Sequence, residues 1–312
     1  MSRYLITGGA GFIGSHIAEA LVGEGHAVRI FDNLSSGHLH NLDHLAGKVE
    51  FVRGDVRDAA AIRAAAQGID YLFHEAALVS VFESVEKPFD NHEINMTGTL
   101  NVLQAARAAG VRRVVFASSA AIYGNDPELP KREGMAPQPA SPYAAGKITG
   151  EYYLSIFAQL YGVQTVSLRY FNVYGPRQDP KSMYSGVISK FTDDLKAGRT
   201  PTIFGDGGQT RDFVFVKDVV QANLRAMHGD NAGTGEAFNV ASGRTASLLE
   251  LLGTIGDLAG RKIEPQFKEA RRGDIRHSAA AIDKARAVLG YEPAFDLASG
   301  LRELLAWIKE EL

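Results

Sequence analysis

Short runs of β-branched and aromatic residues alternate along the chain with longer stretches rich in Ala and Leu. The short runs predict strands at Tyr4–Thr7, Ala27–Asp32, Glu50–Arg53, Tyr71–His74, Arg113–Ser118 and Thr165–Arg169. The longer stretches predict helices, among them Ser15–Val22, Ala59–Ala66, Thr97–Ala109 and Pro142–Leu160. This alternation is typical of a parallel, doubly wound α/β sheet with right-handed crossovers. The pattern therefore predicts a Rossmann-type fold.

Composition narrows the function classes. Of 312 residues, 45% are apolar and 22% charged, which is ordinary for a globular protein, and the net charge of −3 offers no basic surface for nucleic acid or an anionic membrane. The absence of cysteine excludes disulfides, thiolate zinc sites and a cysteine nucleophile. His16 and His74 have no metal-ligand spacing around them, so we expect no metal. A strand close to the N-terminus and the lack of a membrane-length apolar run lead us to expect a cytoplasmic protein.

The segment TGGAGFIGSH carries two overlapping glycine patterns between a predicted strand and a predicted helix. Gly9, Gly11 and Gly14 spell G-x-G-x-x-G, and Gly8 with the latter two spells G-x-x-G-x-x-G. Both suit a turn that presents a helix N-terminus to a pyrophosphate. Asp32 ends the next strand, where an acid accepts hydrogen bonds from the adenosine ribose and repels a 2′-phosphate. We therefore expect NAD rather than NADP, although a tight turn with a capping aspartate has the same pattern.

Two later segments break the alternation. Gly124–Ser141 contains four prolines and no apolar period, which predicts a long irregular loop of the kind that is often functional. After Asn172 the pattern gives way to Gly- and Pro-rich turns. We expect these turns to belong to a smaller C-terminal α/β lobe that binds substrate over the strand ends. The expected division is an NAD-binding domain of residues 1–170, to which 211–241 return, and a substrate-binding lobe of residues 171–210 and 242–312.

A phenol and an ammonium group stand four residues apart in Tyr143-Ala-Ala-Gly-Lys147. Ser141 suits the N-cap of a helix and Pro142 its first position, so both groups should share one helical face. A free tyrosine, with a pKa of about 10, is a poor base at neutral pH. The Lys147 cation and a positively charged nicotinamide ring would favour the phenolate and bring it into working range. Tyr and Lys at this spacing also occur on ordinary solvated helices, so the pair gains weight only beside the glycine turn.

A serine pair, Ser118-Ser119, closes the fifth predicted strand, whose end should face the same crevice. Matching segments run through the rest of the chain: DNLSSG, GDVRD, HEAA, Asn95, SSAAIYG, YAAGK, RYFNVYGP, GDGGQTRDFVFVKD and RRGD. With these segments the chain resembles the extended short-chain dehydrogenase/reductase family and, within it, the nucleotide-sugar epimerases. The resemblance covers essentially the whole chain.

The resemblance implies a set of functional residues. Gly8, Gly11 and Gly14 become the working glycines, and Gly9 makes the more familiar motif by coincidence. The catalytic triad becomes Ser119, Tyr143 and Lys147. The implied cofactor contacts, besides these glycines, Asp32, Tyr143 and Lys147, are Phe12, Ile13, Asn33, Ser35, Ser36, Gly37, Asp55, Val56, Ala76, Ala77, Asn95, Ser118, Tyr170, Phe171 and Val173. Asn95 is expected to hold local backbone or water structure.

The resemblance also implies the reaction. Family members begin with Tyr143 taking the proton of a sugar hydroxyl while a hydride leaves carbon 4 for NAD⁺. After the catalytic serine, 4,6-dehydratases carry an acid pair, and decarboxylases carry a glutamate at the place of Ala121. Fucose-forming epimerase/reductases use a cysteine, whereas this chain has Ala120 and Ala121 and no cysteine. We therefore predict C4 epimerisation of a UDP-hexose through a transient 4-keto intermediate, with NAD⁺ regenerated in each turnover.

Other readings stay open at this point. They are a UDP-glucuronate 4-epimerase, a C6 epimerase of ADP-heptose (a group that favours NADP, against Asp32), another nucleotide-sugar oxidoreductase and a non-catalytic dinucleotide sensor. Sensors of the family generally lose the tyrosine or the lysine, so the retention of Tyr143 and Lys147 favours an enzyme.

Substrate contacts follow from the same resemblance. Arg211, Arg271 and Asp274 match positions that bind the diphosphate and the uridine ribose, which suits a guanidinium fork and a carboxylate, although both arginines would also suit surface ion pairs. Asn172 would donate to the sugar or phosphate, Phe204 would pack near the uracil, and Thr202 is a further expected substrate contact. Ser80 would contact a sugar hydroxyl or serve as a helix N-cap.

The sequence departs at two positions from the galactose-type epimerases that have a narrow substrate range, and both positions bear on substrate specificity. Those enzymes have a lysine at the place of Val79 and a tyrosine at the place of Ser278. Ser278 would leave room for an N-acetyl group, so we predict that UDP-GlcNAc and UDP-GalNAc are handled as well as UDP-glucose and UDP-galactose. The apolar stripes of Thr97–Ala109 and Pro142–Leu160 suit the family's usual homodimer, or interior packing.

Overall fold

The computed structural model describes residues 1–179, 186–270 and 275–310. All six predicted strands are present, as β1 (Arg3–Thr7), β2 (Ala27–Asp32), β3 (Val49–Arg53), β4 (Tyr71–His74), β5 (Arg113–Ser119) and β6 (Gln164–Tyr170). They form a parallel sheet with a seventh strand, β11 (Thr234–Val240), in the order β11-β6-β5-β4-β1-β2-β3. The predicted α/β fold class is confirmed.

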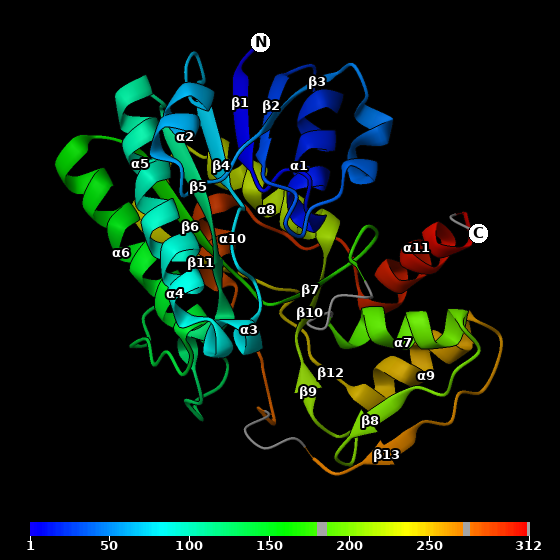
Figure 1. Ribbon diagram of the computed structural model, residues 1–312. Coiled ribbons are helices and arrows are strands. Elements are labelled where there is room, and N and C mark those ends of the chain that lie inside the picture. Colours follow the sequence, from blue (N-terminus) through cyan, green and yellow to red (C-terminus); the bar gives the residue numbers. More distant parts are fainter. Residues whose placement is uncertain (180–185, 271–274, 311–312) are drawn as a thin grey trace.

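Helices cover both faces of this sheet (Figure 1). One face carries α1 (Phe12–Gly23), α8 (Val216–His228) and α10 (Asp283–Leu289), and the other carries α2 (Ala59–Ala65), α5 (Gly98–Ala109) and α6 (Pro142–Tyr161). The four predicted helices are confirmed to within three residues at each end. Because β4 is followed by the short helices α3 (Val81–Glu86) and α4 (Pro88–His92) and a π-helical turn (Glu93–Thr97), the chain folds over the start of α6 before entering α5.

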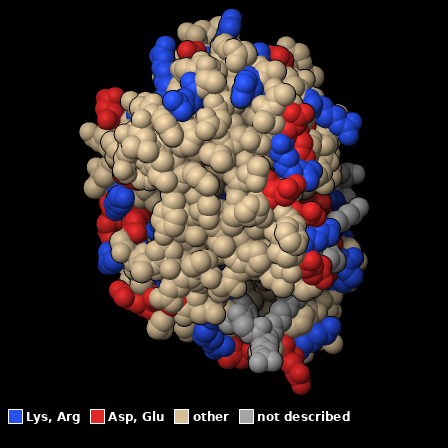
Figure 2. All heavy atoms as spheres, turned by 60° about the vertical axis from the view of Figure 1, so that its left-hand side comes forward, with Lys and Arg blue, Asp and Glu red and all other residues tan. Residues whose placement is uncertain are grey.

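The outer surface of α3, α4 and α6 is unusually apolar. Figure 2 shows the centre of this side free of Lys, Arg, Asp and Glu. The exposed large hydrophobic side chains from these helices are Val81, Phe82, Val85, Phe89, Tyr152, Ile156, Leu160 and Tyr161. A contiguous apolar area of this kind is typical of an interface.

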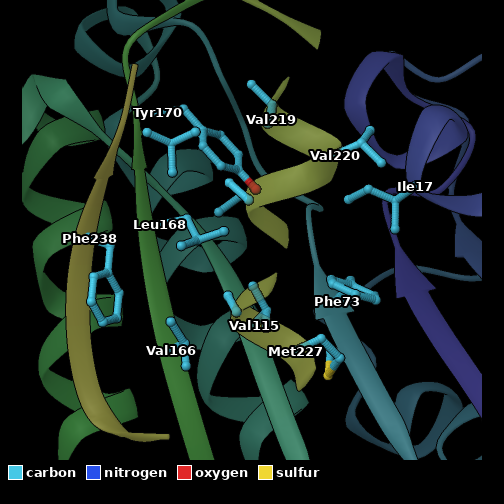
Figure 3. Packing of buried hydrophobic residues seen from close by; sticks show 14 of the residues in the cluster. Ile17, Phe73, Val115, Val166, Leu168, Tyr170, Val219, Val220, Met227 and Phe238 are labelled. Atoms are coloured by element: carbon cyan, nitrogen blue, oxygen red, sulfur yellow. The ribbon is translucent and has the colours of Figure 1, made fainter. Parts of the chain in front are cut away.

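The main core lies between the sheet and the layer of α1 and α8. Figure 3 shows Phe73, Val115 and Val166 from the strands packed toward Val220 and Met227 of α8. These side chains are at most 8% exposed, and each contributes about 1.5–3 kcal/mol by leaving water. A second core between the sheet and α2, α5 and α6 fixes the helix that carries Tyr143.

A smaller lobe lies beyond the carboxyl ends of the strands (Figure 1). It contains the strand pairs β8 (Thr202–Phe204) with β13 (Gln266–Lys268) and β9 (Thr210–Arg211) with β12 (Ala246–Ser247), and the helices α7 (Val187–Lys196), α9 (Leu248–Leu258) and α11 (Leu297–Glu310). A third hydrophobic cluster forms its core. Between lobe and sheet, β7 (Asn172–Tyr174) pairs with β10 (Phe213–Phe215). The division at residues 170, 210 and 241 stays a prediction.

The segment 124–141 is irregular, as predicted, and it is firmly held. The backbone N–H of Lys131 donates to the carbonyl of Ala279 at 2.8 Å, and the N–H of Ala281 donates back to Lys131 at 2.9 Å. The amide of Asn239, on β11, donates to the carbonyl oxygens of Lys131 and Ala281. The loop therefore joins the sheet edge to the chain segment that leads into α10.

Candidate active site

Several positions of the turn after β1 leave no room for a Cβ atom. Gly8 has a φ of +70°, and a Cβ on it would lie 2.6 Å from the N atom of Ala76. A Cβ on Gly14 would lie 2.4 Å from the carbonyl oxygen of Gly8. Gly9, which the resemblance treats as a coincidence, has a packing reason of its own, because a Cβ there would lie 2.7 Å from a methyl carbon of Ile30. The turn is thus pressed tightly against the strand ends, and Gly8, Gly11 and Gly14 lie at its close approaches.

The start of α1 is open to an anion. Its N-cap, Gly11, provides no side-chain cap, and its first turn holds no acidic residue. Free N–H groups and the positive end of the helix dipole therefore face the turn. This arrangement fits a pyrophosphate, with Phe12 and Ile13 in the first turn.

Asp32 is oriented at the end of β2 by backbone donors. Its carboxylate accepts from the N–H of Ala10 at 3.0 Å and from the N–H of Leu34 at 2.8 Å. A Cβ on Gly37 would lie 3.0 Å from the same carboxylate, so the loop approaches it closely. Each carboxylate oxygen keeps a second lone pair, which suits a pair of ribose hydroxyls.

The next acid along this edge, Asp55, is already engaged. Its carboxylate accepts from Arg57 at 2.7 and 3.0 Å and from the side chain of Asn33 at 2.8 Å. The hydrogen bonds from Arg57 hold the pKa of Asp55 well below its usual range. The predicted contacts of Asn33, Ser35, Ser36, Asp55 and Val56 with the cofactor stay predictions.

Tyr143 lies in the first turn of α6, and its neighbours fix that turn. Ser141 caps the helix by accepting from the N–H of Ala144, as predicted, and Pro142 occupies the first position. The N–H of Tyr143 donates to the hydroxyl of Ser84 at 3.1 Å, and the amide of Asn91 donates to the carbonyl of Pro142 at 2.8 Å. Because α3 and α4 supply these bonds, they position the phenol from outside the sheet.

Lys147 lies one turn further along the same face. Its ammonium donates to the carbonyl of Ala117 at 2.7 Å and lies 5.8 Å from the centre of the Tyr143 ring. Burial lowers the pKa of Lys147 to about 8, and the charge of Glu75 opposes that shift. Burial raises the pKa of Tyr143, and a hydrogen bond with Ser119 partly offsets the rise. The phenol alone is therefore a poor base, and further positive charge has to favour its phenolate.

The two serines at the end of β5 have different partners. Ser119 faces Tyr143, and its hydroxyl also accepts from the N–H of Ala121 at 3.1 Å. The hydroxyl of Ser118 instead donates to Glu151 at 2.5 Å, and Glu151 forms a buried ion pair with Arg169 at 2.7 Å. Of the two hydroxyls, only that of Ser119 is directed at the catalytic pair.

Asn95 holds backbone structure, as the resemblance implies. Its amide accepts from the N–H of Leu78 and donates to the carbonyl of Leu78, both at 2.9 Å, and it donates to Asn91. It thereby fixes the strand-to-helix segment that contains Ala76 and Ala77. Ser80, in the same segment, is the N-cap of α3 and accepts from the N–H of Glu83.

A cavity of about 350 Å³ lies in the smaller lobe, beside the pair of strands β7 and β10. The expected substrate residues that line it are Asn172, Thr202, Phe204 and Arg211, together with the expected cofactor residue Val173. Tyr170 and Phe171 directly precede β7 in the sequence, and both side chains are buried. Ser278 is half-buried beside β9, where its N–H donates to the carbonyl of Thr210 at 3.0 Å. Arg271 and Asp274 lie outside the described residues.

Sequence reasoning missed two residues here. Glu75 follows β4 directly, and its carboxylate accepts from the hydroxyl of Tyr170 at 3.0 Å. Gln209 lines the cavity, donates to the carbonyl of Phe204 at 2.7 Å and has a buried amide oxygen. Both residues belong to segments on which the family resemblance rests, HEAA and GDGGQTRDF. These motifs therefore indicated the segments, but they did not identify Glu75 and Gln209 as the residues that make these contacts.

The described residues contain no helix long and apolar enough to cross a membrane. The fold and the site define a dinucleotide-binding α/β protein with a Ser119, Tyr143 and Lys147 group at the strand ends, in which the tyrosine and the lysine are buried. The sequence matches the NAD dependent epimerase/dehydratase family over residues 4–241, and the chain belongs to that family.

Named relatives and solved structures share nearly the whole chain. A UDP-glucose 4-epimerase of Mycolicibacterium smegmatis is 44% identical, with 99% of each sequence aligned. The solved UDP-N-acetylglucosamine 4-epimerase from Methanobrevibacter ruminantium, in complex with UDP-N-acetylmuramic acid, is 38% identical with a TM-score of 0.94, covering 100% of this chain and 99% of that one. The UDP-glucose 4-epimerase of Thermotoga maritima, solved with UDP-glucose, is 38% identical with a TM-score of 0.93, covering 99% of each chain.

Proposed function

We propose that this protein is an NAD-dependent UDP-hexose 4-epimerase that acts on UDP-glucose and UDP-galactose and on their N-acetylated counterparts. The observation that carries the proposal is the buried Tyr143 facing Ser119, with Lys147 one turn away and only alanines at positions 120 and 121. With no acid at positions 120 and 121 to carry out elimination, the site can oxidise a sugar carbon and reduce it again with a bound dinucleotide. Relatives named for this reaction, at 38–44% identity, support the proposal.

Each residue has a distinct role in this scheme. Ser119 holds the substrate hydroxyl, Tyr143 takes its proton and later returns it, and Lys147 supplies the positive charge that favours the phenolate. Bound NAD supplies the chemistry of hydride acceptance and return. The glycine turn and the open N-terminus of α1 would hold its pyrophosphate, and Asp32 its adenosine ribose. A cofactor that is restored within each turnover need not leave.

The substrate would enter through the cavity that Asn172, Thr202 and Phe204 line. Arg211 belongs to the same cavity, and its guanidinium presents a fork of donors that suits a diphosphate. Ser278 lies beside β9, where its N–H donates to Thr210, and its small side chain would leave space for an acetamido group. Arg271 and Asp274 complete the proposed nucleotide contacts.

Two experiments test this function. The nucleotide released when the purified protein is denatured should be NAD⁺ or NADH, held without addition of cofactor. Incubation with UDP-glucose, UDP-GlcNAc and UDP-glucuronate, followed by separation of products, should give the C4 epimers of the first two. Turnover of UDP-glucuronate alone would replace the proposal with the glucuronate epimerase.

The base is tested by Tyr143→Phe. Loss of a general base typically lowers the rate by about 10²–10⁴-fold, so kcat should fall by that factor while the released NAD stays unchanged. Tyr153→Phe is the matched control, because Tyr153 lies on the same helix, outside both the catalytic group and the exposed apolar surface, and the change likewise removes only a hydroxyl. Full activity of Tyr143→Phe would show that another group takes the proton.

We also propose that two copies associate through the apolar outer surface of α3, α4 and α6 (Figure 2). Phe89 is 84% exposed and Leu160 is 70% exposed there, which leaves two large side chains in water in a monomer. Sedimentation should give a dimer for the native protein and a monomer for Phe89→Glu. Leu249→Glu, on α9 of the smaller lobe, should remain dimeric.

A further inference from the structure

The chain on both sides of Ser119 is bound to one buried ion pair, that of Glu151 with Arg169. Ser119 ends β5, and a 3-10 helical turn, η3 (Ala120–Tyr123), follows it directly. The hydroxyl of Ser119 accepts from the N–H of Ala121 at 3.1 Å, within this turn. The direction of the hydroxyl therefore depends on where the backbones of β5 and η3 lie.

The strand side of Ser119 is bound to α6. Lys147 donates its ammonium to the carbonyl of Ala117 at 2.7 Å, and Ser118 donates its hydroxyl to Glu151 at 2.5 Å. Lys147 and Glu151 are four residues apart, so one face of α6 contacts two consecutive residues of β5. The side chains of Ser118 and Glu151 are both buried, so water does not compete for their hydrogen bond. The end of β5 is therefore fixed against α6.

The turn side of Ser119 is bound to the other partner of the ion pair. Arg169 donates to the hydroxyl of Tyr123, the last residue of η3, at 2.9 Å, and its guanidinium lies 5.1 Å from the centre of that ring. The hydroxyl of Tyr123 in turn donates to the side chain of Asn239, on β11, at 2.6 Å. Because Tyr123 is buried, η3 cannot shift without breaking both hydrogen bonds.

The register of the sheet brings the two sides together. Arg169, on β6, is the direct partner of Ser118 in the parallel pairing of β5 with β6. The carboxylate of Glu151 accepts from Arg169 at 2.7 and 2.9 Å and also from Ser118, so one acid binds two neighbouring strands. A buried ion pair is weak evidence for stability, since apolar residues of similar volume often replace one without loss. The positions of these contacts, before and after Ser119, are more specific than a stabilising role requires.

We propose that the ion pair of Glu151 and Arg169 is a positioning clamp for the hydroxyl of Ser119. The pair acts through Ser118 and Tyr123, which keep that hydroxyl directed at the catalytic phenol. The four clamp residues are Ser118, Tyr123, Glu151 and Arg169. The proposal rests on the proposed function, which gives Ser119 its hold on the substrate hydroxyl. Displacement of a catalytic group by about 1 Å can lower a rate about 10²-fold, so the clamp should affect kcat more than substrate binding.

Two conservative variants loosen the clamp on one side at a time. Ser118→Ala removes the hydroxyl that donates to Glu151. Tyr123→Phe removes the hydroxyl that accepts from Arg169 and donates to Asn239. Both variants keep the two charges of the ion pair, so neither leaves a buried charge without its partner.

Two matched controls remove a buried hydroxyl elsewhere. Thr165→Val removes the hydrogen bond from β6 to the carbonyl of Leu154, on α6, at 2.7 Å. Tyr291→Phe removes the hydrogen bond to the carbonyl of Ala241 at 2.8 Å. Each control loses one hydroxyl, as the clamp variants do, but neither hydrogen bond involves β5 or η3.

Hydrogen exchange measures the clamp without substrate. Deuterium uptake of the peptide that contains residues 119–123 is followed by mass spectrometry in the purified protein. Ser118→Ala and Tyr123→Phe should each speed exchange of this peptide about fivefold, as expected for the loss of one hydrogen bond. The controls Thr165→Val and Tyr291→Phe should leave its exchange unchanged. Unchanged exchange in both clamp variants overturns the proposal.

Turnover of UDP-glucose is the second measurement. Both clamp variants should lower kcat about 10–100-fold and leave KM and the content of NAD unchanged. In a Ser119→Ala background the same changes should lower kcat by less than about twofold, because they act through the missing hydroxyl. A merely structural role would lower kcat by the same factor in both backgrounds, and that result would overturn the proposal.

The clamp and the proposed function fail in different experiments. If the native protein epimerises neither UDP-glucose nor UDP-GlcNAc while exchange of residues 119–123 responds as expected, the proposed function alone is overturned. If the native protein is active and both clamp variants keep full kcat, the ion pair has no part in the reaction and the clamp alone is overturned.

Discussion

The ion pair between Glu151 and Arg169 joins α6, the helix that carries Tyr143 and Lys147, to strand β6. Glu151 is one turn beyond Lys147 on α6, and both side chains of the pair are at most 7% exposed. Arg169 donates to both carboxylate oxygens, at 2.7 and 2.9 Å, and Ser118 adds a third donor at 2.5 Å. Glu151→Leu would leave the guanidinium of Arg169 buried and unpaired.

The expected loss in the free energy of unfolding depends on how deeply the ion pair is buried. Removal of one partner of a buried ion pair costs about 3–5 kcal/mol, because the remaining charge cannot return to water. The exposed pair of Lys262 and Glu264 has a similar distance of 2.9 Å, but its side chains are 86% and 78% exposed. An exposed pair contributes about 0–1 kcal/mol, so Glu264→Leu should cost less than 1 kcal/mol.

Urea unfolding followed by circular dichroism measures both variants, with the free energy taken from the midpoint and slope. The double variant Glu151→Leu, Arg169→Met removes both charges, so it should recover part of the loss. It should not recover all of it, since Arg169 also donates to Tyr123 and to the carbonyl of Glu133. If Glu151→Leu costs no more than Glu264→Leu, the pair does not carry its charge in a buried environment and the reasoning fails.

Two further predictions concern the cofactor and the substrate. Gly8→Ala should abolish retention of NAD, because the φ of +70° at Gly8 and a distance of 2.6 Å from the added Cβ to Ala76 leave no room for the methyl group. The control Gly47→Ala, with a φ of +73° and nothing within 4 Å of the added Cβ, should keep NAD and lose about 1 kcal/mol of stability. Equal NAD content in both variants would contradict this prediction. Ser278→Tyr should lose activity on UDP-GlcNAc and keep it on UDP-glucose, as measured by product separation, and an equal loss on both sugars would refute the assigned role of Ser278.

The strands, the first helices and the cap of α6 could be predicted because local patterns determine them. Ser141 and Pro142 fit their positions whatever surrounds them, and the six strands are short apolar runs between turns. The sequence pattern does not predict strand β11, because its sequence TGEAFNV contains Asn239, a polar residue that is buried and donates hydrogen bonds to Lys131 and Ala281. A polar residue satisfied by distant backbone cannot be distinguished from a surface residue in the sequence.

The same limit of prediction from local sequence applies to the candidate site. Tyr143 and Lys147 are four residues apart, so helical geometry alone brings them together. Glu75 meets Tyr170 only because β4 and β6 both end at the same edge of the sheet, and no short-range pattern encodes that contact. Likewise, sequence spacing alone did not show that Ser118 faces Glu151 while Ser119 faces Tyr143. The individual cofactor and substrate contacts stay predictions.

The position of β11 has a consequence for synthesis of the protein. This strand, residues 234–240, pairs with β6, which ends at Tyr170. While the ribosome makes the intervening residues, the edge of β6 has no neighbour on that side, and an open strand edge is a template for pairing with other chains. Completion of the sheet therefore waits for most of the chain to emerge, so a nascent chain stalled between these two strands is the form most exposed to aggregation and to chaperone capture.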